Sequence, residues 1–354
     1  MTKGKVFKGL ALAMLVMLLG VFLVGCGGKS ASDNKTGQQQ GSTSGQASVK
    51  KLRLGWVVAR NPDHPYTAAA ETFAKVLNEK TNGRIQVDLY PGGQLGGDVE
   101  MFEQIRLGSL DAGVISAPPI AGTTKVLIGP DMPYIFNNDL DLAYKALTGP
   151  AGQKLLQKLE TAVGVKALAH LYQPFRHFFT NKPINKLEDM KGLKIRVMQT
   201  PVHIDIFKAL GASPTPLPYN EIYTAMQTGT IDGFESDVIG SVTSKHYEVS
   251  KYITISGHFY NAFVLLMSKK AWDQLSPEEQ KIAQEAANEA AKATLEVSKR
   301  VSDQYFKMLK EKGMTVNQID LKPFIEATKP VIDKYSAEVP EVKEFVAAVE
   351  ALKK

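Results

Sequence analysis

The stretch LGSLDA at residues 107–112 resembles the stretch TGTIDG at residues 228–233. Both have Gly at the second position and Asp at the fifth. Each copy follows a helical segment (VEMFEQIR and EIYTAMQ) and runs into a short strand. In each, the glycine ends the helix in a conformation that most residues avoid, and Ser or Thr together with Asp can satisfy backbone groups before the strand. This shared context predicts two similar lobes with a cleft between them, and such clefts often bind small ligands.

Strand and helix patterns alternate outward from both copies. KLRLGWVVA (51–59), RIQVDLY (84–90) and DAGVIS (111–116) read as strands, and the apolar spacing of Ala69, Phe73 and Leu77 indicates a helix between the first two. This alternation favours a mainly parallel α/β sheet. The second lobe is predicted to begin near Gln173, with its own strands and helices. Its predicted elements are strands at FRHFFTN, LKIRVMQ and KYITIS and helices at about 201–210 and 219–228.

The C-terminal third is dominated by one long predicted helix. SPEE at 276–279 has the Ser cap, the Pro at the first position and the acids of a helix start. The helix runs to about residue 312, longer than one lobe needs, so we expect it to lie across both. NAFVLLMS (261–268) is predicted to return the chain to the first lobe, and two further helices are expected at about 320–336 and 340–353. The predicted domains are 1–25 (signal), 26–49 (tether), 50–172 plus 262–300 (first lobe) and 173–261 plus 301–354 (second lobe).

The strand GLKIRVMQTP (192–201) carries one charge of special interest. Leu193, Ile195 and Val197 alternate with polar or larger residues, which indicates one buried face. Arg196 lies on the other face. From the pattern alone it is either a solvated charge or a guanidinium held for a negative ligand.

The first 49 residues predict export. Three lysines, an apolar run from 10 to 24 and LVGC at 23–26 have the order of a secretory signal. The apolar run is shorter than the roughly 20 residues of a membrane-spanning anchor, and LVGC resembles the lipobox of bacterial lipoproteins, whose cysteine is lipidated. Cys26 is the only cysteine, and residues 27–49 are rich in Gly, Ser and Gln, typical of a flexible tether. We expect an extracytoplasmic protein, anchored by lipid.

Catalytic and cofactor motifs are missing from the sequence. It contains no HExxH, GxSxG, P-loop or GxGxxG pattern, and its six histidines are dispersed. The formal net charge of +6 comes without a basic stripe carrying interleaved aromatics, which argues against nucleic acid. We therefore expect no metal, no cofactor and no enzymatic activity.

Several segments in series resemble the extracytoplasmic solute-binding subunits of TRAP (tripartite ATP-independent periplasmic) transporters, the DctP-like family. The resemblance runs from about residue 52 to 335; its segments include YPGGQLGGDVEMFEQIRLGSLDAGVIS, FRHFFTNKPINKLEDMKGLKIRVMQTPV and LGASPTPLPYNEIYTAMQTGTIDGFES. It implies a two-lobed, periplasmic-binding-protein-like α/β fold, each lobe a mixed sheet flanked by helices, with the long helix spanning both lobes and bending on closure. It also implies that the protein captures an organic acid and delivers it to an ion-gradient-driven permease with large and small membrane subunits, without ATP hydrolysis.

The resemblance also implies particular ligand contacts. The family's signature arginine falls on Arg196, where it makes a bidentate salt bridge to the ligand carboxylate, and a planar guanidinium suits that task. Arg176 matches a second arginine, with an interlobe or surface charge as the alternative. Tyr219 matches an aromatic residue beside the ligand, with a core role as the alternative. The remaining predicted contacts are Gln199, Glu235, Ser236, Asp237 and His258, together with Trp56, His64 with Pro65, Asp98 and Ser116 from the first lobe.

One segment departs from the family pattern. Many members have GQENP where this chain has GFESD at 233–237. Ser236 replaces an Asn that often bonds the ligand, and Asp237 replaces Pro. The added carboxylate should disfavour a second negative group on the ligand, or favour hydroxyls or a cationic nitrogen. We therefore expect a monocarboxylate with polar substituents, such as a sugar acid, a hydroxy acid or an amino-acid derivative.

Two other functional classes stay open at this point. One is a receptor component that presents its ligand to a sensor protein, and the other, less favoured, is a secreted enzyme on a similar scaffold. A monomer is expected, and a dimer is left open.

Overall fold

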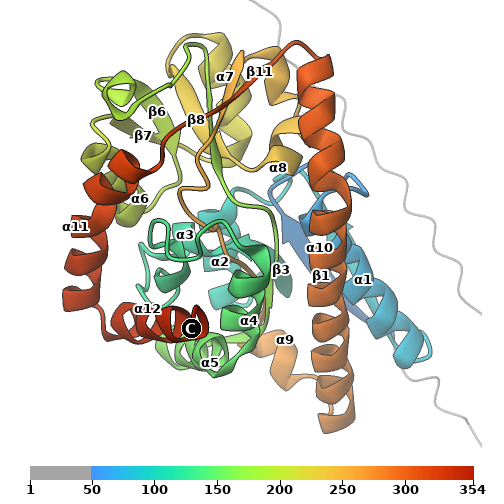
Figure 1. Cartoon of the computed structure of the whole chain (residues 1–354). Helices are drawn as coiled ribbons and strands as arrows, with labels where there is room; N and C mark the ends of the chain where they lie inside the picture. Colours follow the sequence, from blue (N-terminus) through green and yellow to red (C-terminus); the bar gives the residue numbers. More distant parts are fainter. Residues whose placement is uncertain (1–48) are drawn as a thin grey trace, which may run out of the picture. The chain divides into compact units, whose positions relative to one another are not determined.

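Two β-sheets organise residues 49–354, the part of the chain that this computed structural model describes (Figure 1). The predicted signal segment, the lipidation site Cys26 and the tether up to residue 48 lie outside the described residues. We call the first sheet with its helices the first lobe, and the second sheet with its helices the second lobe.

The first sheet has five strands: β1 (Lys50–Trp56), β2 (Ile85–Tyr90), β3 (Ala112–Ser116), β4 (Val165–Leu171) and β10 (Phe263–Ser268). They lie in the order β2–β1–β3–β10–β4. The strand β1 is parallel to β2 and β3, whereas β10 is antiparallel to β3 and β4. The helices of this lobe are α1 (Pro65–Lys80), α2 (Asp98–Arg106), α3 (Ala117–Ile120), η1 (Gly129–Asp131), α4 (Leu140–Thr148), α5 (Pro150–Val163) and α9 (Lys269–Asp273).

The second sheet has six strands: β5 (His177–Thr180), β6 (Lys194–Val197), β7 (Ser213–Pro216), β8 (Gly233–Ser236), β9 (Tyr252–Ile255) and β11 (Thr315–Gln318). Their order is β11–β9–β5–β8–β6–β7. The strand β6 is parallel to β7 and β8, and β5 is antiparallel to β8 and β9. The helices of this lobe are η2 (Leu187–Met190), α6 (Pro201–Ala209), η3 (Tyr219–Glu221), α7 (Ile222–Gln227), α8 (Val238–Thr243), η4 (His246–Glu248) and α11 (Lys322–Glu338).

Both sheets are mixed, as the family resemblance implied and unlike the mainly parallel sheet that the strand–helix alternation suggested. The antiparallel strands β5 and β10 each follow a direct crossing between the lobes, at residues 172–176 and 256–262. A strand that enters its sheet from the crossing starts where the parallel strands end, and so it runs against them. The carboxyl ends of the parallel strands and the starts of β5 and β10 therefore meet at one place.

The internal repeat is confirmed in three dimensions. Gly108 and Gly229 both have a φ of +70° at the end of a helix, a conformation that favours glycine. Asp111 then accepts a hydrogen bond from the backbone N–H of Arg53 on the neighbouring strand (2.8 Å), and Asp232 accepts one from Lys194 in the same way (2.9 Å). Each repeat thus joins a helix end to a strand pair by the same contacts.

The long helix α10 (Pro277–Glu311) spans both lobes, as predicted (Figure 1). Its first half packs against α1 and β4 of the first lobe and its second half against α8 of the second. The buried residues change accordingly, from small alanines such as Ala286 and Ala290 to the larger Val301, Tyr305 and Leu309. Small residues let the first half approach its neighbours closely.

Hydroxyl groups in the middle of α10 hold the first crossing between the lobes. The Thr294 hydroxyl accepts a hydrogen bond from the backbone N–H of Tyr172 (3.0 Å), and the Ser298 hydroxyl donates one to the Tyr172 carbonyl (3.1 Å). Two residues after Ser298, Arg300 pairs with Asp63 in the loop before α1 (2.7 Å). The helix is therefore tied to the crossing and to the first lobe at the level where the lobes meet.

The last helix, α12 (Pro340–Leu352), packs on the first lobe, against η1, α4 and α5. Its buried residues Val342, Phe345 and Val349 lie on one face, and the Phe345 ring meets Phe136 edge-on with centroids 6.2 Å apart. This differs from the predicted division, which assigned residues 301–354 to the second lobe. The apolar spacing predicted a helix but carried no information about which lobe covers it.

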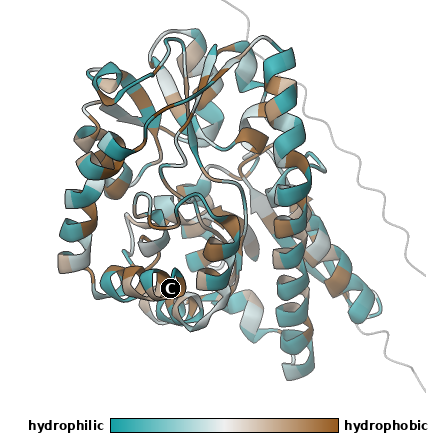
Figure 2. Ribbon diagram, viewed as in Figure 1, coloured by the Kyte–Doolittle hydropathy of each residue, from teal (hydrophilic) through white to brown (hydrophobic). Residues whose placement is uncertain are grey.

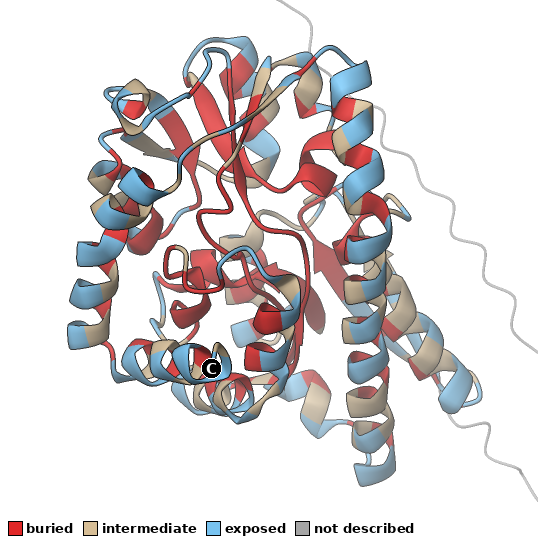
Figure 3. Cartoon of the chain, in the orientation of Figure 1, coloured by how far each residue is buried: buried red, intermediate tan, exposed pale blue. Residues whose placement is uncertain are grey.

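The distribution of hydropathy and burial agrees with this two-lobed arrangement. Figure 2 shows helices with hydrophilic outer faces, and Figure 3 shows buried residues concentrated in the strands and in the segments between the lobes. Across residues 49–354, no helix combines the length and apolar character needed to cross a membrane.

The start of α10 provides a test of the helix signal. Ser276 accepts a hydrogen bond from the Glu279 backbone N–H (3.2 Å), and the Glu279 carboxylate accepts one from the Ser276 N–H (2.8 Å), which forms a capping box. Replacing Ser276 with Ala should lower the free energy of unfolding by about 1 kcal/mol, as measured by urea denaturation. Ser302→Ala, in the middle of the same helix, is the control and should leave stability nearly unchanged; equal losses in both variants would contradict the capping role.

Candidate functional site

One pocket lies between the two sheets, where the strand ends and both crossings meet. First-lobe residues, second-lobe residues and residues of the crossings all contribute to its walls. The lining residues are Val57, Val58, His64, Tyr66, Asp98, Ser116, Pro119, Gln173, Arg176, Arg196, Met198, Gln199, Pro218, Tyr219, Asp237 and Asn261. This is the position at which open α/β sheets bind ligands.

Arg196 lies on β6 and is 2% exposed. Its Nε donates to the Leu217 carbonyl (2.9 Å) and its Nη1 donates to Glu235 Oε1 (3.1 Å). Among residues 49–354, its Nη2 has no hydrogen-bond acceptor. Burial lowers the pKa of Arg196 to about 10, although Glu235 opposes this shift, so the side chain is cationic at neutral pH. The result is a fixed cation with a free donor at a pocket wall.

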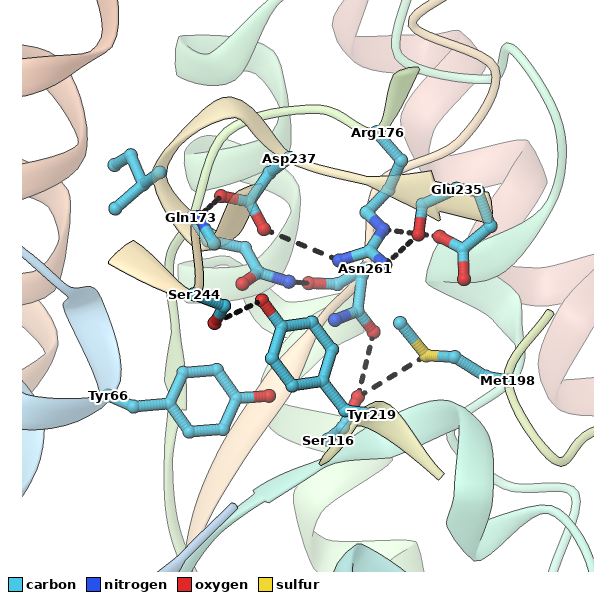
Figure 4. Close-up of polar contacts among 12 residues, drawn as sticks. Tyr66, Ser116, Gln173, Arg176, Met198, Tyr219, Glu235, Asp237, Ser244 and Asn261 are labelled. Carbon is cyan, nitrogen blue, oxygen red and sulfur yellow. Dashed lines mark hydrogen bonds and ion pairs between the residues drawn. The ribbon is translucent and has the colours of Figure 1, made fainter. Parts of the chain in front are cut away.

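Arg176 immediately precedes β5 and uses every nitrogen of its guanidinium. Nε donates to Glu235 Oε2 (2.5 Å), Nη2 to the Glu235 carbonyl (2.7 Å), and Nη1 to Asp237 Oδ2 (3.3 Å). Burial lowers the pKa of Arg176, but Glu235 and Asp237 outweigh this and raise it above its ordinary value. Figure 4 shows the guanidinium between these two acids. Each of the three nitrogens of Arg176 thus has one protein acceptor, which uses three of its five N–H groups.

Asp237 continues β8 and begins α8. Its Oδ1 accepts a hydrogen bond from the Gly240 N–H (2.8 Å), while Oδ2 faces Arg176. A Cβ on residue 240 would lie 2.8 Å from the Tyr219 hydroxyl and 3.2 Å from Asp237 Oδ2. Glycine at this position therefore lets the tyrosine and the aspartate lie close together in the pocket wall.

The first-lobe wall is polar. Asp98 Oδ1 accepts from the Ser116 backbone N–H (2.9 Å), and the Ser116 hydroxyl donates to Asn261 Oδ1 (3.0 Å). The Gln173 amide donates to the Asn261 carbonyl (2.9 Å), so both crossings are joined beside the pocket (Figure 4). Burial raises the pKa of Asp98 to about 7, against the opposing effects of the Ser116 N–H and Arg196.

Aromatic rings close two sides of the pocket. Tyr66 stacks on Phe263 with centroids 4.4 Å apart, and the Tyr219 hydroxyl bonds Ser244 Oγ (3.1 Å). Figure 4 shows Tyr66 reaching in from the first lobe and Tyr219 from the second. Burial, and then the charge of Asp237, raises the pKa of Tyr219 to about 12, and burial lowers the pKa of His64 to about 4. Both groups are neutral near pH 7.

The enclosed space is small in this arrangement. Its volume is about 30 Å³, enough for only a water molecule or two. The Ser116 hydroxyl lies 3.6 Å from the Met198 sulfur, a contact between the two lobes. Any larger ligand therefore requires the walls to separate before it enters. Within residues 49–354, no group of three or more His, Cys, Asp and Glu side chains is placed to hold a metal ion.

Most of the residues predicted from sequence lie at this pocket. The structure brings together Arg196, Arg176, Gln199, Tyr219, Asp237, Asp98, Ser116 and His64 in its lining. Five predicted residues do not line it, and one of them, Pro65, is the buried first residue of α1. Trp56 lies in the first-lobe core, and Glu235 is 0% exposed beneath the arginines. Ser236 is buried, and His258 bonds Ser256 (2.7 Å) and stacks on Phe178.

Sequence reasoning did not identify several lining residues. Those missed include Tyr66, Gln173, Met198 and Asn261. Tyr66 and Met198 are close in sequence to predicted residues, so extending each predicted segment by two positions would have included them. Gln173 and Asn261 lie on the crossings, which had been located only as boundaries. The missing information was that both crossings pass along the cleft.

Comparison with known proteins agrees with the family resemblance seen in the sequence. The family described as bacterial extracellular solute-binding protein, family 7 (DctP), matches residues 57–338. The 2,3-diketo-L-gulonate-binding periplasmic protein YiaO of Escherichia coli K12 is 32% identical over 316 residues, which cover 87% of this chain and 94% of YiaO.

Solved structures agree with this assignment. The sugar acid binding protein DctPAm of Advenella mimigardefordensis, in complex with galactonate, has a TM-score of 0.82 at 32% identity and covers 86% of this chain and 99% of its own. A TRAP periplasmic solute-binding protein of Polaromonas sp. JS666, bound to D-erythronate, gives the same TM-score, identity and coverage. This chain therefore belongs to the DctP family of extracytoplasmic solute-binding subunits of TRAP transporters.

Proposed function

We propose that this protein captures an organic acid in the interlobe pocket and delivers it to a TRAP permease with large and small membrane subunits. The observation that carries the proposal is the free Nη2 of Arg196, held at a pocket wall by two bonds on its other nitrogens. A guanidinium so fixed offers a planar donor edge to a carboxylate. Because it is buried, it also favours an anion over a neutral ligand.

The rest of the lining supports a hydroxylated acid. Asp98, Ser116 and Gln173 supply acceptors and donors around the cavity, and the phenols of Tyr66 and Tyr219 are neutral donors. The named relatives bind 2,3-diketo-L-gulonate, galactonate and D-erythronate, all acids with several oxygen substituents. We propose a ligand of this kind for the present pocket. Trp56, Pro65, Glu235, Ser236 and His258 remain predicted contacts.

We also propose that the protein acts outside the cytoplasm and catalyses no reaction. Export by residues 1–25 and lipid attachment at Cys26 would hold the protein at the outer face of a membrane, beside its permease. The role needs only binding and release, because transport is driven by an ion gradient. The pocket is too small for an organic acid in this arrangement, so it would have to open to admit the ligand and to release it.

A panel of acids tests the binding function. All the lining residues named above lie within residues 49–354, so the mature protein can be screened by thermal shift against D-galactonate, D-gluconate, D-erythronate and D-glucuronate. A bound acid should raise Tm in proportion to the logarithm of its concentration, whereas its methyl ester should not. A folded protein that no organic acid stabilises would contradict the proposal.

Arg196 provides the sharpest single substitution. Arg196→Ala should weaken binding of the acid that gives the largest thermal shift by about 3–5 kcal/mol, at least about a hundredfold in Kd by isothermal titration calorimetry. Arg196→Lys keeps the charge opposite Glu235 but removes the planar donor edge, so it should also bind weakly while retaining the fold.

The matched control is Arg106→Ala, which removes an arginine that pairs with Glu103 on the surface of α2. Its Kd should equal that of the unmodified protein. Near-normal affinity in both Arg196 variants would reject the carboxylate role of this residue.

Asp98 provides a pH test of the same site. Its pKa is raised in the folded protein, so between about pH 4 and pH 7 the folded state holds a proton that the unfolded state has lost, and stability falls as pH rises. Asp98→Asn removes this effect. Its Tm relative to the unmodified protein should therefore increase from pH 4.5 to pH 8, and a difference independent of pH would contradict the assignment.

Membrane attachment is tested through Cys26. Cys26→Ser should move the protein from the membrane fraction to the soluble fraction after cell lysis, because no other cysteine can carry the lipid. Ser30→Ala, four residues away in the tether, should stay with the membrane. Continued membrane association of Cys26→Ser would reject the lipoprotein hypothesis.

A further inference from the structure

The two arginines of the pocket differ in what they can still bind. Arg176 directs Nε and Nη2 to Glu235 and Nη1 to Asp237. Arg196 has Nη2 without an acceptor among residues 49–354. One arginine therefore remains open to a ligand carboxylate, and the other is engaged by acids of the protein itself.

Asp237 is the group that closes the pocket side of Arg176. Both residues line the pocket, whereas Glu235 does not. Asp237 is 3% exposed, and the oxygen of its carboxylate that does not face Arg176 accepts a hydrogen bond from the Gly240 N–H (2.8 Å). It is thus positioned independently of the arginine, and its contact with Nη1, at 3.3 Å, is the longest of the three that Arg176 makes.

The charges of the two arginines are already balanced by acids of the protein. Arg176 and Arg196 are opposed by Glu235 and Asp237, all of them buried. One ligand carboxylate at Arg196 adds a single negative charge to this cluster. A second carboxylate would lie in the same low-dielectric space with no free cation to receive it, and it would also face Asp98. Buried like charges repel strongly because water does not screen them.

We infer that Asp237 restricts this pocket to acids with a single carboxylate, by occupying the position on Arg176 that a second ligand carboxylate would need. The inference rests on the proposed function and names the ligand class of the same site. A terminal hydroxyl at this end of the ligand can donate to Asp237, whereas a terminal carboxylate cannot. The residue therefore separates two ligands that differ only in the oxidation of one end.

Pairs of such ligands provide the experiment. The unmodified protein and Asp237→Asn are titrated calorimetrically with D-galactonate and galactarate, D-gluconate and D-glucarate, and D-erythronate and meso-tartrate. The deciding pair is the one whose monocarboxylate gives the largest thermal shift. The unmodified protein should prefer the monocarboxylate by at least about tenfold in Kd, and Asp237→Asn should reduce that preference by at least about tenfold.

Two further variants test whether the charge of residue 237, rather than its shape or the loss of any acid in the protein, sets the preference. Asp237→Glu keeps the carboxylate and should retain the preference. Asp205→Asn removes an acid that pairs with Lys334 outside the pocket (2.7 Å) and should leave the preference unchanged. Circular dichroism and Tm without ligand establish that each variant is folded.

The outcomes are distinguishable. Equal binding of both members of the pair by the unmodified protein, or an unchanged preference in folded Asp237→Asn, would overturn the inference while leaving the proposed function intact. Failure of every monocarboxylate and dicarboxylate to bind the unmodified protein would overturn the proposed function and the inference with it.

Discussion

The buried carboxylate of Glu235 determines the arrangement of the whole site. Each of its side-chain oxygens accepts from a different arginine, Oε2 from Arg176 and Oε1 from Arg196. Without it, two guanidinium groups would lie close together in a space with little water, where like charges repel strongly. Sheet order makes the contact possible: β8, which carries Glu235, lies between β5 and β6. A carboxylate on the middle strand can reach an arginine on either side.

This constraint connects the fold to the pocket. Arg196 is held on a short strand by the Leu217 carbonyl and Glu235, so its free nitrogen has a fixed direction and little side-chain entropy is lost when a ligand binds. The opposite wall belongs to the first lobe, and the chain joins it to the second through the crossings, α10 and the step from α11 to α12. Thr294 and Ser298 hold one crossing by its backbone at Tyr172. Walls carried by two separate sheets are suited to opening as two bodies.

Sequence patterns predicted the features of the fold that depend only on residues close together in the chain. The glycines at 108 and 229 and the capped start of α10 each involve residues close in the chain, and the structure agrees with both. The alternation around Arg196 correctly placed Ile195 and Val197 in the core, but Arg196 is buried as well, so both faces of β6 are covered. The partners of Glu235 are 39 and 59 residues away, so no local pattern announces them. The strand β7 (SPTP) was not predicted, since proline is tolerated only at a sheet edge, and β7 lies at an edge. Partners distant in sequence become visible only when the strand order is known.

The balance of charges explains why Asp237, in place of the proline expected from the family pattern, should have a large effect on which ligand binds. Proline at residue 237, which the family resemblance led us to expect, would leave one fewer acid beside the two arginines, and a bound carboxylate there would neutralise the cluster. Here Asp237 neutralises it before any ligand arrives. The ligand's own charge must then be offset elsewhere, and Asp98, whose pKa of about 7 lies near physiological pH, is the group in the pocket that can respond by holding a proton. Binding of an acid and protonation of Asp98 should therefore favour one another.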